Sequence, residues 1–174
     1  MKKMKRMLKG IISLAIVLSI CVLPVNAAEG PYTVENNNWG GADGMILNCY
    51  TTGIVDSGTQ VSTWTKTGNP SQKWFIYSEA GGKQSLRPQA NTSLALNANR
   101  SAIGTTANVL TASTNNPLDY RITSNMHKTP GNFKIILPAR YNHTAPVYLT
   151  AHGPKAMCTW QYYNGNTDWI AGNY

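Results

Sequence analysis

The chain has 174 residues, of which only 13% are charged, and 15 basic against 7 acidic residues give a formal net charge of +8. Five of the basic residues lie in the first 27 positions, which contain no acidic residue. Residues 28–174 therefore hold ten basic and seven acidic residues, a charge of only +3. This balance excludes the strongly basic surface of a nucleic-acid-binding protein, so we expect no nucleic-acid partner.

The first 27 residues have the pattern of a secretory signal. Their five Lys and Arg residues precede an apolar run from Ile11 to Leu23, which Pro24 and a set of small residues follow. We expect cleavage near Ala27 and an extracellular protein. The apolar run is short for a membrane helix, and no other stretch reaches the ~20 apolar residues that such a helix needs. We therefore expect no membrane span, and a single domain at residues 28–174.

After this segment, the same pattern of four short strands occurs three times. The first strands read "YTVEN", "QSLRPQ" and "FKIILPA". The second strands align on Leu47, Leu96 and Leu149. The third strands, "VSTW", "VLTA" and "MCTW", end at Trp64, Ala112 and Trp160. The fourth strands align on the aromatic residues Trp74, Tyr120 and Trp169, which are 46 and 49 residues apart. The three repeats span about residues 32–78, 84–124 and 133–172.

Three such repeats predict an all-β fold of the β-trefoil type, a six-stranded barrel capped by three hairpins. One four-stranded unit cannot bury its apolar face alone, whereas three units that close on each other bury a common core and remove the open sheet edges. A seven-stranded sandwich is the competing all-β architecture, but it does not explain the threefold register. We expect Trp74, Tyr120 and Trp169 to be core residues near the threefold axis rather than ligand contacts.

This arrangement resembles the R-type lectins, the ricin B-chain family, over nearly all of residues 28–174. The most specific element is Gln72-Lys73-Trp74, where the other repeats carry Leu118-Asp119-Tyr120 and Thr167-Asp168-Trp169. The resemblance implies a shallow sugar site within a repeat. In such a site an acidic residue after the leucine of the second strand accepts hydrogen bonds from sugar hydroxyls. An aromatic residue of the third strand stacks on the sugar ring, and the glutamine holds the acidic side chain in place.

The resemblance places the main carbohydrate site in the first repeat. Asn48 takes the place of the acid, Trp64 is the stacking aromatic, and Ser71 and Gln72 form the polar brace. Asp56, in the loop "TTGIVDSGTQ", is expected to wall the pocket. The change from a carboxylate to Asn48 departs from the family pattern, because an amide loses the stronger, charge-assisted hydrogen bond.

The other two repeats depart further from the pattern. Ala112 offers no ring in the second repeat, so we expect no site there. The third repeat keeps Trp160 as a stacking aromatic, but Thr150 replaces the acid and the loop "HGPKA" is shorter. A different polar and aromatic surface can form there from Asn164 and its neighbours Tyr162, Tyr163 and Asn166. A structural interpretation remains open as well: Trp64 and Trp160 are then partly buried strand residues, and Asn48 satisfies backbone groups at a turn.

The sequence nominates no catalytic site, metal site or cofactor. His127, His143 and His152 have no regular metal-ligand spacing, and the seven acidic residues offer no facing pair for glycoside hydrolysis. We therefore expect a protein that is not an enzyme. Cys49 and Cys158 are the two cysteines after residue 27, and both a disulfide and two buried thiols remain open.

Two classes of function fit these observations. The first is a secreted lectin that binds a glycan or glycoprotein, chiefly through the first repeat. The second is a secreted trefoil that binds a separate protein subunit or partner, as a toxin accessory subunit, an inhibitor or a receptor ligand, because a fold does not determine a function. The loss of the acid in every repeat favours the second class. Trp64 together with Gln72 favours the first.

Overall fold

The computed structural model describes residues 28–39, 45–79, 83–97, 104–111, 121–122, 132–137 and 145–173. The predicted signal segment, Ala112, Tyr120, His127 and His143 lie outside these residues. In the first repeat the elements are β1 (Ala28–Asn36), η1 (Asn37–Trp39), β2 (Ile46–Cys49), β3 (Val61–Trp64), η2 (Pro70–Gln72) and β4 (Lys73–Glu79). In the second they are β5 (Lys83–Pro88), β6 (Leu94–Asn97), β7 (Asn108–Thr111) and β8 (Arg121–Ile122). In the third they are β9 (Asn132–Phe133), β10 (Ile135–Leu137), β11 (Val147–Thr150), β12 (Thr159–Gln161), η4 (Gly165–Thr167) and β13 (Trp169–Asn173).

The first and last strands of the repeats pair with one another in antiparallel fashion to form the barrel wall. β1 lies between β4 of its own repeat and β13 of the third repeat, and β4 pairs with β5 of the second repeat. β13 pairs with β9, and β10 with β8. The wall therefore joins strands of all three repeats.

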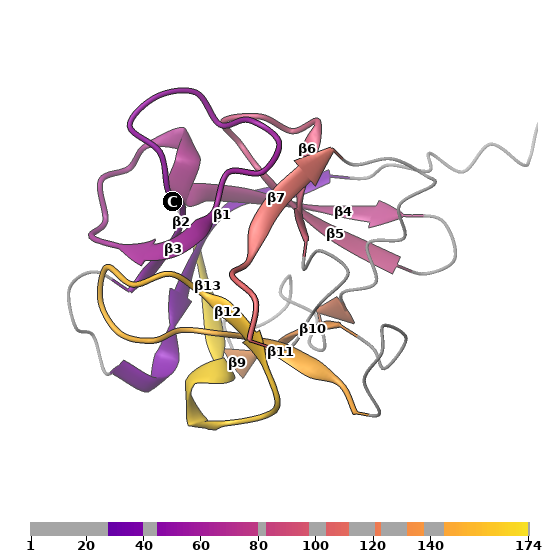
Figure 1. The fold of residues 1–174 in the computed structure, drawn as a ribbon. Helices are drawn as coiled ribbons and strands as arrows, with labels where there is room; N and C mark the ends of the chain where they lie inside the picture. The colour runs from indigo at the N-terminus through magenta and orange to yellow at the C-terminus, as the bar shows by residue number, and fades with distance from the viewer. Residues whose placement is uncertain are drawn as a thin grey trace, which may run out of the picture.

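The second and third strands of each repeat form a hairpin: β2–β3, β6–β7 and β11–β12 (Figure 1). A closed triangle of backbone hydrogen bonds joins the three hairpins. Val61 N–H donates to Ala107 O at 2.8 Å, Ala107 N–H to Cys158 O at 2.9 Å, and Cys158 N–H back to Val61 O at 2.9 Å. Each repeat supplies one residue, one donor and one acceptor, so these three residues mark a pseudo-threefold axis.

The core contains equivalent apolar residues from each repeat. Val34, Leu86 and Ile135 from the first strands are fully buried, and so are Leu47, Leu96 and Leu149 from the second strands. Alternate residues of a strand point to opposite faces, and these positions supply the inner face of the barrel and the hairpins. Burial of large apolar side chains from three repeats in one core is the main favourable contribution to the stability of this fold.

Trp74 and Trp169 occupy equivalent environments. Both side chains are fully buried. The Trp74 indole Nε1–H donates to Leu47 O at 3.0 Å, and the Trp169 indole Nε1–H donates to Leu149 O at 3.1 Å. Each ring therefore fastens the fourth strand of its repeat to the second strand, and its one polar group has a partner. The all-β prediction and the trefoil architecture are confirmed, and the sandwich alternative does not fit these pairings.

Candidate functional site

The β2–β3 hairpin has a fully buried inner face and an opposite face on which Tyr50 is exposed and Trp64 partly exposed to solvent, whereas Ile46, Asn48 and Ser62 are largely buried. Leu47, Cys49, Val61 and Thr63 point inward and are fully buried. The opposite face carries Ile46, Asn48, Ser62 and Trp64, and the ladder continues to Tyr50, whose N–H donates to Gln60 O at 2.8 Å. We call these five residues the outer face of the hairpin: Ile46, Asn48, Tyr50, Ser62 and Trp64. It is the part of the first repeat where the predicted stacking residue lies.

Trp64 and Tyr50 form an aromatic pair on the outer face. Their ring centroids lie 5.8 Å apart and the rings meet edge to face at 60°. Tyr50 is 49% exposed and Trp64 is partly exposed, so neither ring belongs to the core. An exposed aromatic pair presents an apolar surface that a flat, weakly polar ligand can cover. The family pattern did not point to Tyr50, although its position two residues after Asn48 places it on the same face of the strand.

Asn48 belongs to β2, and hydrogen bonds join its side chain to β3 and to the turn η2. The Ser71 hydroxyl donates to Asn48 Oδ1 at 3.3 Å, and Asn48 Nδ2 donates to Ser62 Oγ at 3.5 Å. Both bonds are longer than the usual 2.7–3.2 Å range, and the amide has two donors and an acceptor with two lone pairs. Asn48 is therefore held in place and retains hydrogen-bonding capacity, although only 7% of it is exposed.

Gln72 differs from the expectation. It is fully buried, and its Oε1 accepts from the Thr67 N–H at 2.7 Å and the Thr67 hydroxyl at 3.0 Å. Its Nε2 donates to Thr65 O at 2.7 Å. Gln72 thus braces the segment that follows Trp64, whereas Ser71 is the residue that bonds Asn48. Gln72 therefore acts on the site indirectly, because its side-chain hydrogen bonds hold the segment that follows Trp64.

Asp56 lies in an exposed turn in which Thr59 N–H donates to Asp56 O at 3.0 Å. The loop around it is fastened to the second repeat. Gly58 N–H donates to Val109 O at 2.8 Å, and Asn91 Nδ2 donates to Val55 O at 3.0 Å. These bonds hold the tip of the loop against the second repeat, and no bond from the Asp56 carboxylate to Asn48 or Trp64 is recorded among the described residues.

The third repeat contributes a cation to the same region. Lys155 is exposed, and its Nζ lies 5.9 Å from the centroid of the Trp64 ring. The segment that carries Lys155 is fastened to β3 through Thr63, whose hydroxyl donates to Gly153 O at 2.6 Å. The sequence did not point to Lys155, because the contact crosses from one repeat to another.

The prediction that Trp160 is a stacking residue is wrong. In the structure, β12 is shifted by one residue relative to β3 from the alignment that places Trp160 opposite Trp64. Leu149 pairs with Trp160 in β11–β12, where Leu47 pairs with Thr63 in β2–β3. Trp160 is therefore the equivalent of Thr63 and points inward, and its ring is fully buried. Its Nε1–H donates to Asn97 O in the second repeat at 3.2 Å. A ring enclosed in this way has no face for a sugar.

The residues equivalent to Trp64 are Leu110 and Gln161, not Ala112 and Trp160. β6–β7 has the same register, since Leu96 pairs with Val109. Three further backbone bonds agree with it: Thr63 N–H donates to Ala156 O, Val109 N–H to Thr59 O and Trp160 N–H to Thr105 O. A slip of one residue exchanges the two faces of a strand, so the side chain on the outer face of the third hairpin is an amide instead of an indole.

The outer side of β11–β12 carries a polar group and an aromatic pair. Gln161 Nε2 donates to Thr159 Oγ1 at 3.1 Å, and His152 Nε2 lies 2.6 Å from Thr159 Oγ1. Tyr148 and Tyr163 meet edge to face, with centroids 5.7 Å apart. Asn164 Nδ2 reaches Gln161 Oε1 at 3.4 Å. Several of these polar groups are hydrogen-bonded to one another, which leaves them fewer hydrogen bonds to offer a ligand.

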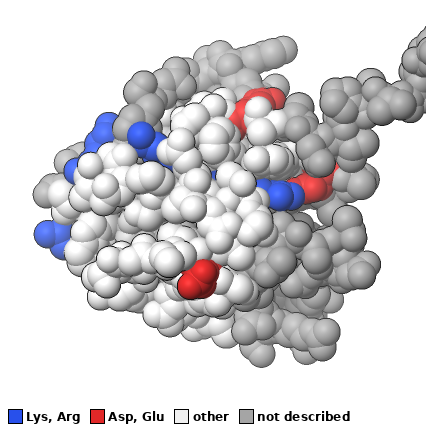
Figure 2. Space-filling view, turned by 90° about the horizontal axis from the view of Figure 1, so that it is seen from above, with Lys and Arg blue, Asp and Glu red and all other residues white. Residues whose placement is uncertain are grey.

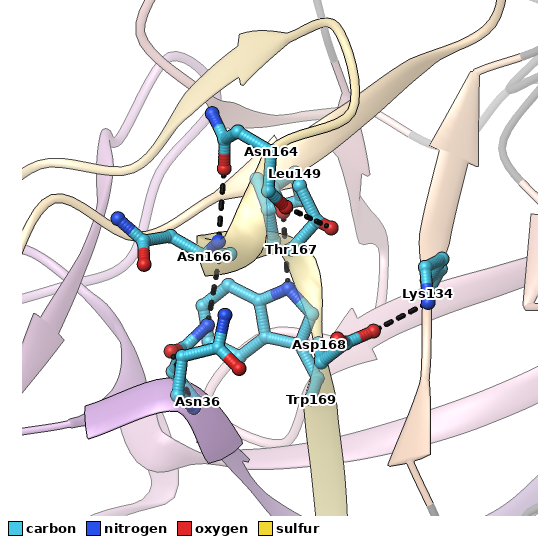
Figure 3. A network of polar contacts seen from close by, with 9 residues as sticks. Asn36, Lys134, Leu149, Asn164, Asn166, Thr167, Asp168 and Trp169 are labelled. Carbon is cyan, nitrogen blue, oxygen red and sulfur yellow. Dashed lines mark hydrogen bonds and ion pairs between the residues drawn. The ribbon is translucent and has the colours of Figure 1, made fainter.

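Asn164 and its neighbours also close the turn before β13 (Figure 3). Asn164 Oδ1 accepts from Asn166 N–H at 2.9 Å, and the Thr167 hydroxyl donates to Asn164 O at 2.9 Å. Asp168 forms an ion pair with Lys134 at 2.5 Å, and this hydrogen bond raises the pKa of Lys134 above its usual value, against a smaller effect of desolvation. The bonds to Asn166 and Thr167 show that Asn164 stabilises the start of η4.

Both cysteines are buried free thiols, so the disulfide alternative does not apply. Desolvation by burial raises the pKa of the Cys49 thiol to about 12 and raises that of Cys158 as well. Within the described residues, no three His, Cys, Asp or Glu side chains come together as a metal site. The same part of the chain contains no helix long and apolar enough to cross a membrane.

Comparison of the fold with solved structures gives a consistent result, although the sequence matches no family model and no curated protein. The chain is similar to the designed threefold-symmetric protein ThreeFoil, with a TM-score of 0.62, 16% identity, and coverage of 84% of this chain and 100% of that one. By shape, this chain is a β-trefoil.

Two lectins have the same shape. The β-trefoil lectin domain of the Vibrio vulnificus hemolysin/cytolysin, solved with N-acetyl-D-lactosamine bound, matches with a TM-score of 0.60 and 15% identity over 85% of this chain and 95% of that one. The Macrolepiota procera ricin B-like lectin, solved with lactose, matches with a TM-score of 0.58 and 15% identity over 88% of this chain and 99% of that one. At these identities the likeness concerns the trefoil fold.

Proposed function

We propose that this protein is an exported lectin that binds a carbohydrate on the outer face of the β2–β3 hairpin. The observation that carries the proposal is the pair Trp64 and Tyr50 next to Asn48 and Ser71. A sugar ring has an apolar C–H face and a rim of hydroxyls, and these two halves match an aromatic surface and an amide–hydroxyl pair. The similarity in shape to trefoils solved with lactose and N-acetyl-D-lactosamine supports the same reading.

The hydrogen-bonding groups of Asn48 and Ser71 are uncharged, so we expect these two residues to give weak binding at a single site. Asn48 offers an amide where the resemblance called for a carboxylate, and an uncharged acceptor forms the weaker hydrogen bond. Asp56 is part of this proposal only as a residue of the neighbouring loop. Trp160 and Gln72 are not part of the binding surface, because both are fully buried.

A glycan array with purified protein comprising residues 28–174 tests the proposal. Trp64→Ala is expected to weaken binding to the recognised glycan about tenfold or more through the loss of ring stacking. The matched control is Tyr163→Ala, which removes another exposed aromatic ring from the third repeat. Loss of binding in Tyr163→Ala alone would move the site to the third repeat. A wild type that binds no glycan would refute the lectin proposal and leave a protein partner as the alternative.

Export is a separate part of the proposal, and it rests on the pattern of residues 1–27. Expression of the full chain in a secreting host should release a protein whose N-terminus, read by mass spectrometry, lies near residue 28. Release of a chain that still carries residues 1–27, or retention of the whole chain in the cell, would contradict it.

A further inference from the structure

Lys155 is placed beside Trp64 by the backbone around it. Thr63, the fully buried neighbour of Trp64, accepts from Ala156 N–H at 3.1 Å and donates to Gly153 O at 2.6 Å through its hydroxyl. The Thr63 N–H also donates to Ala156 O at 2.8 Å. Lys155 thus lies between two residues that are fastened to β3, and its own φ of 57° is in the left-handed region. A positive φ is uncommon for a residue other than glycine.

The Lys155 ammonium has capacity for a ligand. At 5.9 Å it lies near the outer limit of the distance at which a cation is attracted to an aromatic ring. Among the described residues the recorded ion pairs join Arg87 to Glu79 and Lys134 to Asp168, and neither involves Lys155. The contrast with Lys134 is informative, because that lysine contacts the Tyr163 ring at 5.3 Å and is also neutralised by a carboxylate.

Among the described residues, an amide occupies the position near Trp64 where the family pattern would supply an acid. Asn48 stands at that position, and the loop that carries Asp56 is fastened to the second repeat, whereas Lys155 approaches from the third. Figure 2 shows Lys and Arg side chains along the left side of the displayed face, and a further basic side chain beside an acidic one right of its centre. A cation at a sugar site attracts negative charge and repels none of the hydroxyls.

We infer that this site selects glycans that carry a negative group, a carboxylate or a sulfate, which Lys155 binds while the sugar ring lies against Trp64. The inference rests on the proposed lectin function and adds the class of glycan. A charge-assisted hydrogen bond from an ammonium to an anionic oxygen is roughly twice as strong as a neutral one, and here it replaces the charged bond that is lost with Asn48.

Matched immobilised oligosaccharides test this inference: lactose, sialyllactose and a lactose sulfate, at low and at physiological salt. We expect the wild type to bind at least one acidic form about tenfold more tightly than lactose, and the difference to shrink as salt rises. Lys155→Gln should abolish the preference, so that this variant binds the acidic forms no more tightly than it binds lactose. Lys155→Arg should keep it, and Lys134→Gln, which removes the same charge in the third repeat, should keep it too.

Each outcome has a distinct meaning. Tight binding of the sialylated form alone or of the sulfated form alone identifies the source of the negative group. Equal binding of lactose and both acidic forms overturns the inference and leaves the lectin proposal intact. An acidic preference that persists in Lys155→Gln, and in Lys155→Asn as a variant suited to the left-handed backbone, also overturns it. No binding of any glycan overturns both proposals together.

Discussion

The β2–β3 and β11–β12 hairpins occupy equivalent places in the trefoil, and each contains a tryptophan near the end of its second strand. Trp64 points outward, beside Tyr50 and Lys155. Trp160 points inward and is fully buried against the second repeat. The difference arises from a shift of one residue along the strand. Two tryptophans that look alike in the sequence therefore have opposite placements, one on the outer face where we propose that a sugar binds and one in the core.

The same shift separates the chemistry of the two outer faces. In the first repeat, the outer face ends in an indole, and Asn48 next to it holds hydrogen-bonding capacity in reserve. In the third, Gln161 replaces the indole, and its amide is engaged with Thr159, His152 and Asn164. The fold thus supplies three equivalent positions, and the register of each strand determines which side chain its outer face carries.

The largest expected effect is on stability and separates the two tryptophans directly. Trp160→Ala should lower the free energy of unfolding by about 3–5 kcal/mol, because it leaves a large cavity in the core. Trp64→Ala should lower it by less than about 1 kcal/mol, as for other surface substitutions. Denaturant unfolding of both variants measures the difference. Equal losses would mean that the two rings have similar environments, which would contradict the one-residue shift.

The second test compares the braces beneath the two hairpins, Gln72 and its counterpart Thr167. Gln72→Ala should cost roughly 2–3 kcal/mol, because the backbone groups of Thr65 and Thr67 lose buried partners. Thr167→Val removes a single bond, to Asn164 O, and should cost about 1 kcal/mol.

The same pair of variants also separates stability from binding. Gln72→Ala should weaken glycan binding as well, since it loosens the segment that follows Trp64, whereas Thr167→Val should leave binding intact. Calorimetric unfolding and glycan titration of the two variants measure both quantities. A Gln72→Ala variant with full stability would show that the segment after Trp64 is held in another way.

Much of the fold could be predicted because equivalent apolar positions recur at each repeat. Leu47, Leu96 and Leu149 aligned correctly, and the spacing of Trp74 and Trp169 identified two residues with the same indole–carbonyl bond. The third strands could not be aligned in this way. Residues 50–60 join β2 to β3, and the shorter segment 151–158 joins β11 to β12, so matching the two tryptophans introduced the slip.

The candidate site could be predicted only in part. Trp64, Asn48 and Ser71 come from one repeat, and the structure brings them together. The position of Tyr50 on this face could also be predicted, because alternate residues share a face of a strand. Lys155 was not, since it meets Trp64 only after the third repeat packs on the first. Contacts between repeats depend on the closure of the trefoil, which no short pattern of residues encodes.

The smallest expected effect concerns the ion pair beside the third hairpin. The pKa of Lys134 is raised by its hydrogen bond to Asp168, so the pair contributes stability below the usual lysine pKa of 10.5 and loses it as the pH rises through the raised value. Lys134→Gln should therefore cost less than about 1 kcal/mol at neutral pH, and the gap from the wild type should close in strong alkali. A gap that is constant with pH would assign the effect to side-chain packing.

The indole N–H groups report most directly on the central claim that the outer face of β2–β3 is the binding surface and that Trp160 belongs to the core. Amide and indole hydrogen exchange, followed by NMR during titration with sialyllactose, observes Trp64, Trp74, Trp160 and Trp169 in one experiment. We predict rapid exchange for the Trp64 indole and a shift of its signal on titration, with slow exchange and unmoved signals for the other three. A protected Trp64 indole, or a titration that moves Trp160 instead, would contradict it.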